Sequence, residues 1–538
     1  MSRIQFPYRR ESTRRQHSSS NNGDFVTGSS HNDSIESERA AQERQQDGGG
    51  AGAGADGATP GPAAGAAGAA GPAAGVAGVA GPTPSPALLE ALAGRRPART
   101  PVWFMRQAGR SLPEYRALRA RADVPMLEAC LDPVLAAEVT LQPVLRHGVD
   151  AAVFFSDIMV PLRLAGVGVR IEEGVGPVLD APVRSGREVD ELVARRFGDG
   201  PGAEGVGAIE EAVRRVVVEL GSPQAAGVRE GLSERARTGL EHSAGSAGWT
   251  PVLAFGGAPF TLAAYLVEGR PSRDHLAART LMRADPDSWD RLMTWCARLT
   301  GEFIAAQVRA GAAAAQLFDS WAGSLSPRTY RERVAPYSAL TLETARGALS
   351  PTTGEAVPLI HFGTGTARLL GLMRQVGADA VGVDERIELG EAIEALAGAD
   401  PQAGACPVQG NLDPALLAAP WPILAEEVDA VLAAGRAAPG HVVNLGHGVP
   451  PATDADVLTR IVARVHSSAD WEAVALAGWD AVADAPAQAG EVPGGPSGSS
   501  GPEPQDRQSL REPGRQAPRG PGGRPLARTT RRLGREEH

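Results

Sequence analysis

The stretch that decides the fold reads PVWFMRQAGRSLPEYR and occupies residues 101–116. Its apolar part, residues 102–105, is typical of a short buried strand. Two arginines, Arg106 and Arg110, follow directly on a loop of small residues. Because a guanidinium group matches a carboxylate in a paired, fork-like geometry, this junction predicts a clamp for anions. The alternative for an isolated pair is two arginines that only face solvent.

The residues after this loop have the pattern of a helix start. Ser111 and Glu114 show the spacing of a capping box, in which a serine side chain and a glutamate three residues later satisfy free backbone N–H groups. We therefore expect Ser111 to cap a helix that begins near Pro113. The segment then reads as a strand, a basic loop and a helix.

The same alternation of short apolar runs and helical patterns continues along the chain. One predicted helix places apolar residues three and four apart, at Ile209, Val213, Val216, Val217 and Leu220. Eight runs, most of them bounded by Gly or Pro, are strand candidates: residues 101–105, 150–155, 251–256, 313–318, 358–362, 380–383, 407–409 and 441–445.

Eight strands that alternate with helices predict an α/β protein with a single (β/α)8 TIM-type barrel, whose functional groups lie at the carboxyl ends of the strands. A doubly wound open sheet is the alternative, but the first strand is not followed by a GxGxxG sequence. We expect the barrel to span residues 86–470, with an insertion at about residues 221–250. Residues 1–85 and 485–538 are rich in Gly, Ala, Pro, Ser and Arg, and we expect both tails to be disordered.

Composition excludes several classes of function. The formal net charge of −10 argues against nucleic acid as a partner. No apolar run is long enough to span a bilayer, so we expect a soluble, cytoplasmic protein with no membrane partner. The sequence contains no lysine, which rules out a lysine Schiff base and a P-loop. The three cysteines, Cys130, Cys296 and Cys406, lie too far apart in sequence for a CxxC metal site.

Polar residues follow the predicted strands, and in a barrel such residues would converge on one mouth. They are Arg106, Ser156, Asp157, Asp319, Ser320, His361, Asp384, Asn411 and His447.

Four candidates have both a structural and a functional interpretation. Asp157 lies among large apolar residues and would be either the N-cap of a helix or a buried carboxylate that stabilises positive charge. Tyr265 would be a core residue or a ligand contact. Ser320 has no adjacent histidine, so a hydrogen bond to substrate fits it better than a nucleophilic role. His447, between two glycines, would be a residue of a pocket rim or a loop histidine without a role.

The chain resembles the uroporphyrinogen decarboxylase family across about residues 87–466. The matching segments occur in the family's order: PVWFMRQAGR, FFSDIMVPL, EEGVGPV, GGAPFTLAAYLVEG, QLFDSWAG, HFGTGT, VQGNLDP and NLGHGVPP. The resemblance implies a homodimeric (β/α)8 barrel that converts the four acetate arms of uroporphyrinogen III to methyl groups, giving coproporphyrinogen III without cofactor or metal. Ser111 stands where the family usually has tyrosine.

The resemblance also implies roles for individual residues. Asp157 and Arg106 would be catalytic, with Asp157 receiving the pyrrole N–H groups of the substrate. The carboxylate-binding loop would comprise Arg106, Gln107, Ala108, Gly109 and Arg110, and the side arms would contact Tyr265, Ser320 and His447. The proton donor stays open, since a guanidinium gives up its proton reluctantly and a bound water or a substrate carboxylic acid could relay it.

Two rival functions keep the fold. A zinc-dependent methyltransferase of related barrel type would need a His-x-Cys pair, but here that pair reads His361-Phe362-Gly363 and lacks the thiolate. A porphyrinogen-binding protein without turnover would have no need of the buried charge that we expect at Asp157.

Overall fold

The computed structural model describes residues 85–198, 202–221, 234–399 and 404–467, and within them the predicted alternation of strands and helices is present. The two predicted disordered tails lie outside the described residues, apart from Ser85. The same holds for residues 222–233 of the predicted insertion; its remaining helix, α8 (Glu234–Ala244), packs against α4 (Pro133–His147).

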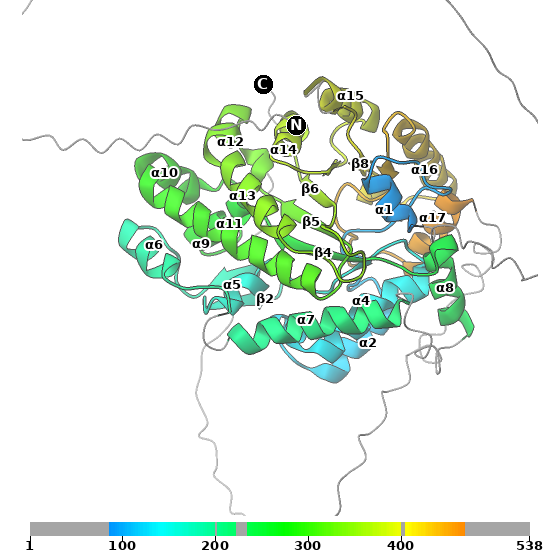
Figure 1. Cartoon of the computed structure of the whole chain (residues 1–538), viewed down its shortest axis with the longest axis horizontal. Helices are drawn as coiled ribbons and strands as arrows, with labels where there is room; N and C mark the ends of the chain where they lie inside the picture. Colours follow the sequence, from blue (N-terminus) through cyan, green and yellow to red (C-terminus); the bar gives the residue numbers. More distant parts are fainter. Residues whose placement is uncertain (1–84, 199–201, 222–233, 400–403, 468–538) are drawn as a thin grey trace, which may run out of the picture. The chain divides into compact units, whose positions relative to one another are not determined.

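The core of the fold is a parallel sheet that curls into a barrel, with helices packed around it (Figure 1). Its order is β1-β4-β5-β6-β7-β8-β9, so each strand pairs with the next parallel strand in sequence. The bounds are Ala152–Val153 (β1), Val252–Gly257 (β4), Ala314–Asp319 (β5), Leu359–Gly363 (β6), Ala380–Gly382 (β7), Val408–Gln409 (β8) and His441–Val442 (β9).

The first predicted strand is reduced to a bridge, but it closes the barrel. Val102 pairs in parallel with Val443, just after β9, and its carbonyl accepts a 2.8 Å hydrogen bond from the N–H of Asp150, just before β1. The segment around Val102 therefore supplies the eighth position of the barrel. Together with the helices between the strands, this confirms the predicted (β/α)8 fold and excludes the open sheet.

Helices connect successive strands and bury their apolar faces on the barrel. The predicted helix around Val213 is α7, in which Ile209, Val213 and Val216 are buried. The helices are α1 (Ala87–Leu92), α2 (Pro113–Ala122), α3 (Met126–Leu131), α4, α5 (Val160–Leu164), α6 (Gly186–Val193), α7 (Gly202–Glu219), α8, α9 (Pro259–Glu268), α10 (Leu276–Ala284), α11 (Pro286–Arg309), α12 (Pro327–Arg333), α13 (Ala335–Arg346), α14 (Leu370–Gln375), α15 (Leu389–Ala399), α16 (Trp421–Gly435) and α17 (Ala455–His466).

One element was not predicted. Strands β2 (Val169–Glu172) and β3 (Gly176–Leu179) form an antiparallel hairpin separate from the barrel sheet. The N–H of Leu179 donates to the carbonyl of Gly269 at the end of α9, which anchors the hairpin to the barrel. No helix among the described residues is long and apolar enough to cross a membrane.

Candidate active site

A cavity of about 960 Å³ opens where the carboxyl ends of the barrel strands meet. Its wall comes from the segments that follow Val102, β1, β5, β6 and β9, and the turn between β2 and β3 forms one side. Eight of the nine predicted site residues line it: Arg106, Gln107, Ala108, Gly109, Arg110, Asp157, Ser320 and His447.

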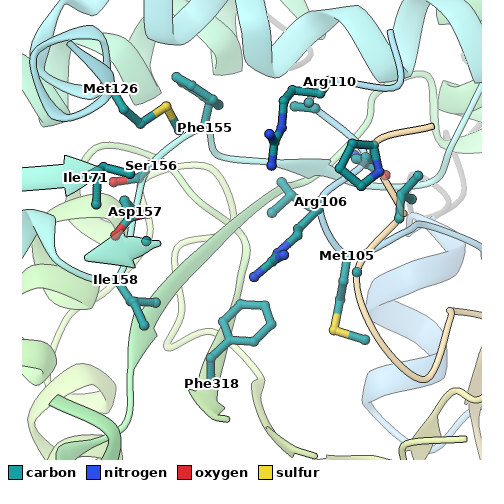
Figure 2. Close-up of a pocket in the computed structure, with 18 of the residues that line it drawn as sticks. Met105, Arg106, Arg110, Met126, Phe155, Ser156, Asp157, Ile158, Ile171 and Phe318 are labelled. Carbon is teal, nitrogen blue, oxygen red and sulfur yellow. The ribbon is translucent and has the colours of Figure 1, made fainter. Parts of the chain in front are cut away.

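The basic loop faces the cavity in a left-handed turn. Arg106 has a φ of 61°, a conformation that costs a residue with a side chain about 1–3 kcal/mol and is common at functional sites. Among the described residues, no carboxylate forms an ion pair with Arg106 or Arg110, and both are exposed. Their guanidinium groups reach into the cavity, with Asp157 on its other side (Figure 2). The guanidinium groups of the loop are therefore open to the cavity.

Gln107 holds this loop in place. The residue is fully buried, its Oε1 accepts a 3.0 Å hydrogen bond from the N–H of Phe104, and its Nε2 donates over 2.9 Å to the carbonyl of Ala151. Both functional atoms of the amide are thus used by backbone groups of the first two strand segments. The Gln107 side chain therefore fixes the loop that carries Arg106 and Arg110.

The predicted capping box at the start of α2 is wrong. The N-cap is Leu112, with Pro113 as the first helical residue, and no side chain caps this helix end. The Ser111 hydroxyl is buried and finds no partner among the described residues. Glu114 turns instead to the buried Arg146 of α4, at 3.1 Å, because a guanidinium is the stronger partner for its carboxylate.

The alternative that Asp157 caps a helix is wrong, since Met159 is the N-cap of α5 and no side chain caps that helix end. The Asp157 Oδ1 atom accepts a 2.8 Å hydrogen bond from the N–H of Met159, just ahead of α5, and Asp157 lines the cavity. Burial raises the pKa of the carboxyl, while the Met159 hydrogen bond and the charge of Arg106 lower it. A ligand that brings N–H donors to this carboxylate would stabilise its ionised form further.

Tyr265 lies behind the cavity wall. Its ring stacks on Trp321, with centroids 4.0 Å apart, and it is the one predicted site residue outside the lining. Burial, followed by the charge of Asp157, raises the pKa of Tyr265 to about 12. At the rim, desolvation and the charge of Arg106 lower the pKa of His447, which favours a neutral imidazole.

The prediction that all polar strand ends converge on the mouth is wrong for four residues. Asp319 and His361 are fully buried and face each other outside the cavity. Asp384 binds Arg386 at 2.6 Å, and the amide of Asn411 donates to the carbonyls of Asp384 and Ile387. Side chains alternate along a strand, so only every second one reaches the inside of a barrel.

The cavity also contains residues that sequence reasoning missed. Arg116 and Arg119 of α2 add positive charge, and the Arg119 Nη1 atom is buried with no partner among the described residues. In the sequence, the spacing of these two arginines after Arg110 could have indicated that they belong to the same site. Apolar walls come from Phe155, Ile171, Phe255, Phe318 and Phe362.

No cluster of three or more His, Cys, Asp or Glu side chains in the described part of the chain could hold a metal ion. His361 lies against Asp319 and the Met373 carbonyl, and the three cysteines are buried and free. These residues do not fit the ligand set of a zinc methyltransferase.

The fold and the cavity define a (β/α)8-barrel protein with an arginine-lined cavity at the carboxyl ends of its strands. The chain belongs to the uroporphyrinogen decarboxylase family, whose model, "Uroporphyrinogen decarboxylase (URO-D)", matches residues 83–228 and 240–468. The break in this match falls within the predicted insertion.

Curated relatives agree with this assignment, and a solved structure shares the fold. The uroporphyrinogen decarboxylase of Arthrobacter sp. is 53% identical over 380 residues, covering 71% of this chain and 96% of the relative. That of Leifsonia xyli is 52% identical over 388 residues, covering 70% and 93%. The structure of a methyltransferase from Methanosarcina mazei shares the fold, with a TM-score of 0.50 and 16% identity, covering 71% of this chain and 97% of that one.

Proposed function

We propose that this protein is a carboxy-lyase that removes carbon dioxide from the four acetate side chains of uroporphyrinogen III, giving coproporphyrinogen III in porphyrin biosynthesis. Membership of the family and the names of its relatives support this reaction. The observation that carries it is a single cavity with free guanidinium groups on one side and the carboxyl of Asp157 on the other.

The arginine loop is proposed to bind the substrate's carboxylates. Uroporphyrinogen carries eight carboxylate groups, and guanidinium groups keep their charge and their paired geometry when partly buried. Arg106 and Arg110 would clamp side arms, with Gln107, Ala108 and Gly109 providing the shape of the loop. Ser320, His447 and Tyr265 would contact the remaining arms, Tyr265 after a small movement of the cavity wall.

Asp157 is proposed to accept the inward-pointing pyrrole N–H groups. Among the described residues its carboxylate has one hydrogen-bond partner, the N–H of Met159, and it retains acceptor capacity toward the cavity. Since burial raises its pKa and N–H donors lower it, substrate binding and ionisation of Asp157 support each other.

The ionised carboxylate would stabilise the cation formed during the reaction. Protonation of a pyrrole ring on carbon makes the ring an electron acceptor, and the bond from the acetate CH₂ to its carboxylate then breaks, releasing carbon dioxide. The methylene carbon takes up a proton and the ring carbon returns one, so each arm consumes one proton net and releases one carbon dioxide. The apolar walls enlarge the effect of Asp157, because charge interacts more strongly away from water.

Arg106 is proposed to hold the reacting arm beside Asp157 throughout this step. A guanidinium gives up its proton reluctantly, so a bound water or a substrate carboxylic acid is the better proton source. We further propose that the protein acts as a cytoplasmic homodimer, which cell fractionation and sedimentation of the purified chain would test.

The decisive experiment measures carbon dioxide release from uroporphyrinogen III by the wild type and by Asp157→Asn. We expect the variant to lose about 100-fold or more in kcat, the range seen when one stabilising group for a developing charge is removed. Asp429→Asn, which breaks a surface ion pair with Arg464, is the matched control and should stay fully active. An inactive wild type that still binds the substrate would point to a binding protein without turnover and would overturn the proposal.

A further inference from the structure

Two ionisable side chains, Asp319 and His361, lie fully buried behind the cavity wall, with Asp319 Oδ2 3.7 Å from His361 Nε2. They belong to the neighbouring parallel strands β5 and β6, in which Phe318 pairs with Phe362. These two phenylalanines line the cavity. Because successive side chains alternate between the faces of a sheet, Asp319 and His361 point away from the cavity, each directly beside one of its walls.

The carboxylate of Asp319 also reaches a third element. The Thr261 hydroxyl on α9 donates a 3.2 Å hydrogen bond to Asp319 Oδ1. Thr261 lies one helical turn before Tyr265, on the same side of the helix. His361 in turn places its Nδ1 3.4 Å from the Met373 carbonyl on α14. The pair therefore joins two strands and two helices.

Three side chains of the proposed site depend on these joined elements. Ser320 is the residue after Asp319, Phe362 is the residue after His361, and Tyr265 is carried by the same helix as Thr261. Trp321 stacks on Tyr265, so a shift of α9 against β5 would move both rings. A buried ionisable cluster is poor at adding stability, since apolar residues of equal volume often do as well or better. The presence of the cluster is better explained by a role in positioning the side chains of the site.

We propose that Asp319, together with His361 and Thr261, is a positioning group that fixes Tyr265, Ser320 and the phenylalanine wall relative to one another for the decarboxylation. The inference rests on the proposed function, since it assigns these residues to the same site. Asp319 touches no reacting atom and acts through the elements that it joins.

A matched control for Asp319 lies at the opposite end of β6. Asp379 Oδ2 accepts a 2.8 Å hydrogen bond from the N–H of Leu359, the first residue of β6, and pairs with Arg346 at 3.1 Å. Asp379→Asn therefore weakens a comparable strand-to-helix attachment remote from the cavity. Asp319→Asn keeps the size of the side chain and removes its charge.

The first measurement is steady-state kinetics with uroporphyrinogen III. We expect Asp319→Asn and Thr261→Val to lower kcat/KM by about tenfold, in line with the sensitivity of catalysis to small misplacements. Thr261→Ser, which keeps the hydroxyl, should restore the wild-type value. Asp379→Asn should lower Tm and leave kcat/KM within about twofold of the wild type. Equal kcat/KM losses in Asp319→Asn and Asp379→Asn would overturn the inference.

The second measurement does not depend on turnover. Fluorotyrosine labelling of the five tyrosines gives separate fluorine NMR signals, and Tyr265→Phe assigns that of Tyr265. We expect the Tyr265 signal to shift in Asp319→Asn and Thr261→Val and to stay in place in Asp379→Asn. An unmoved signal in Thr261→Val refutes the positioning role even if Asp319→Asn does not fold. An inactive wild type would instead refute the proposed function, and the NMR result would still decide whether Asp319 and Thr261 position Tyr265.

Discussion

Gly448 packs directly against the side chain of Arg106: a Cβ atom on this glycine would lie 2.5 Å from Arg106 Cδ and 2.8 Å from Cγ. The segment after β9 therefore shapes the path of the guanidinium from the loop after the first strand. At this contact the segment after the last barrel strand meets the loop after the first. A larger residue at this position would collide with Arg106, which explains why a glycine follows His447.

Gly448→Ala should therefore displace Arg106. We expect kcat/KM for uroporphyrinogen to fall by about tenfold or more, the equivalent of one charge-assisted hydrogen bond. The loss should be mainly in KM, because the arginine binds carboxylate before and during the reaction.

Gly390→Ala is the control for this change. A Cβ atom at Gly390, in α15, would meet nothing within 4 Å, so activity should be unchanged. Wild-type kinetics for Gly448→Ala would show that Arg106 can move without consequence, contrary to its proposed role.

The acidic limb of the pH profile, where kcat/KM falls as the pH is lowered, should depend on Arg106. The proposed reaction requires ionised Asp157, and because burial raises the pKa of this carboxyl, kcat/KM should fall as the pH falls through that raised value. The charge of Arg106 lowers the same pKa, so Arg106→Gln should move the acidic limb to higher pH. The measurement is kcat/KM between about pH 4 and pH 8, a range that spans ordinary carboxyl and histidine titration.

Arg110→Gln serves as the comparison, because Arg110 is not among the groups that shift the pKa of Asp157. This variant should lose affinity at every pH and keep the position of the limb. A limb that stays in place in Arg106→Gln would mean that Asp157 is not the titrating group.

Some features of this protein follow from local sequence and others do not. The eight strand positions were predictable because short apolar runs bounded by Gly or Pro have few other stable arrangements in an alternating α/β chain. The β2–β3 hairpin was missed because its strands are stabilised by contact with the end of α9, which no local pattern contains. The capping box at Ser111 failed for the same reason, since Glu114 finds the buried Arg146 from another helix.

The residues in and around the cavity likewise divide into those that local sequence could identify and those that it could not. The Arg106 loop and Asp157 were recognisable from the residues around them, and the cavity brings them together. Asp319 and His361 have the same sequence signature as Ser320, a polar residue near a strand end. Only the direction of each side chain across the barrel wall separates a residue that lines the cavity from one that lies behind the wall.

Gln107 should prove more important for stability than for direct contact with substrate. Gln107→Ala leaves the buried N–H of Phe104 and the carbonyl of Ala151 without their partner. We expect a loss of about 2–4 kcal/mol in the free energy of unfolding, the cost of two unsatisfied buried groups, measured by urea denaturation. Gln375→Ala removes an exposed amide that donates to the Ala399 carbonyl and should cost less than about 1 kcal/mol. Equal losses in the two variants would contradict the supporting role of Gln107.

A chain of polar groups lies at the opposite end of the barrel. His466 Nε2 lies 2.8 Å from Asp150 Oδ2, and its Nδ1 lies 2.7 Å from His242 Nε2 on α8. Burial, followed by the charges of His466 and Arg99, lowers the pKa of His242 to about 3. The unfolded chain takes up this proton near the ordinary histidine pKa of about 6.5. The unfolded state therefore binds more protons between these two values, so this group makes the folded state less stable as the pH falls below about 6.5.

His242→Gln removes the titration and should flatten the dependence of the unfolding free energy on pH between about 5 and 7, a window above the ordinary pKa of Asp150. If the variant keeps the wild-type slope in urea denaturation across that window, then His242 does not titrate as the geometry implies.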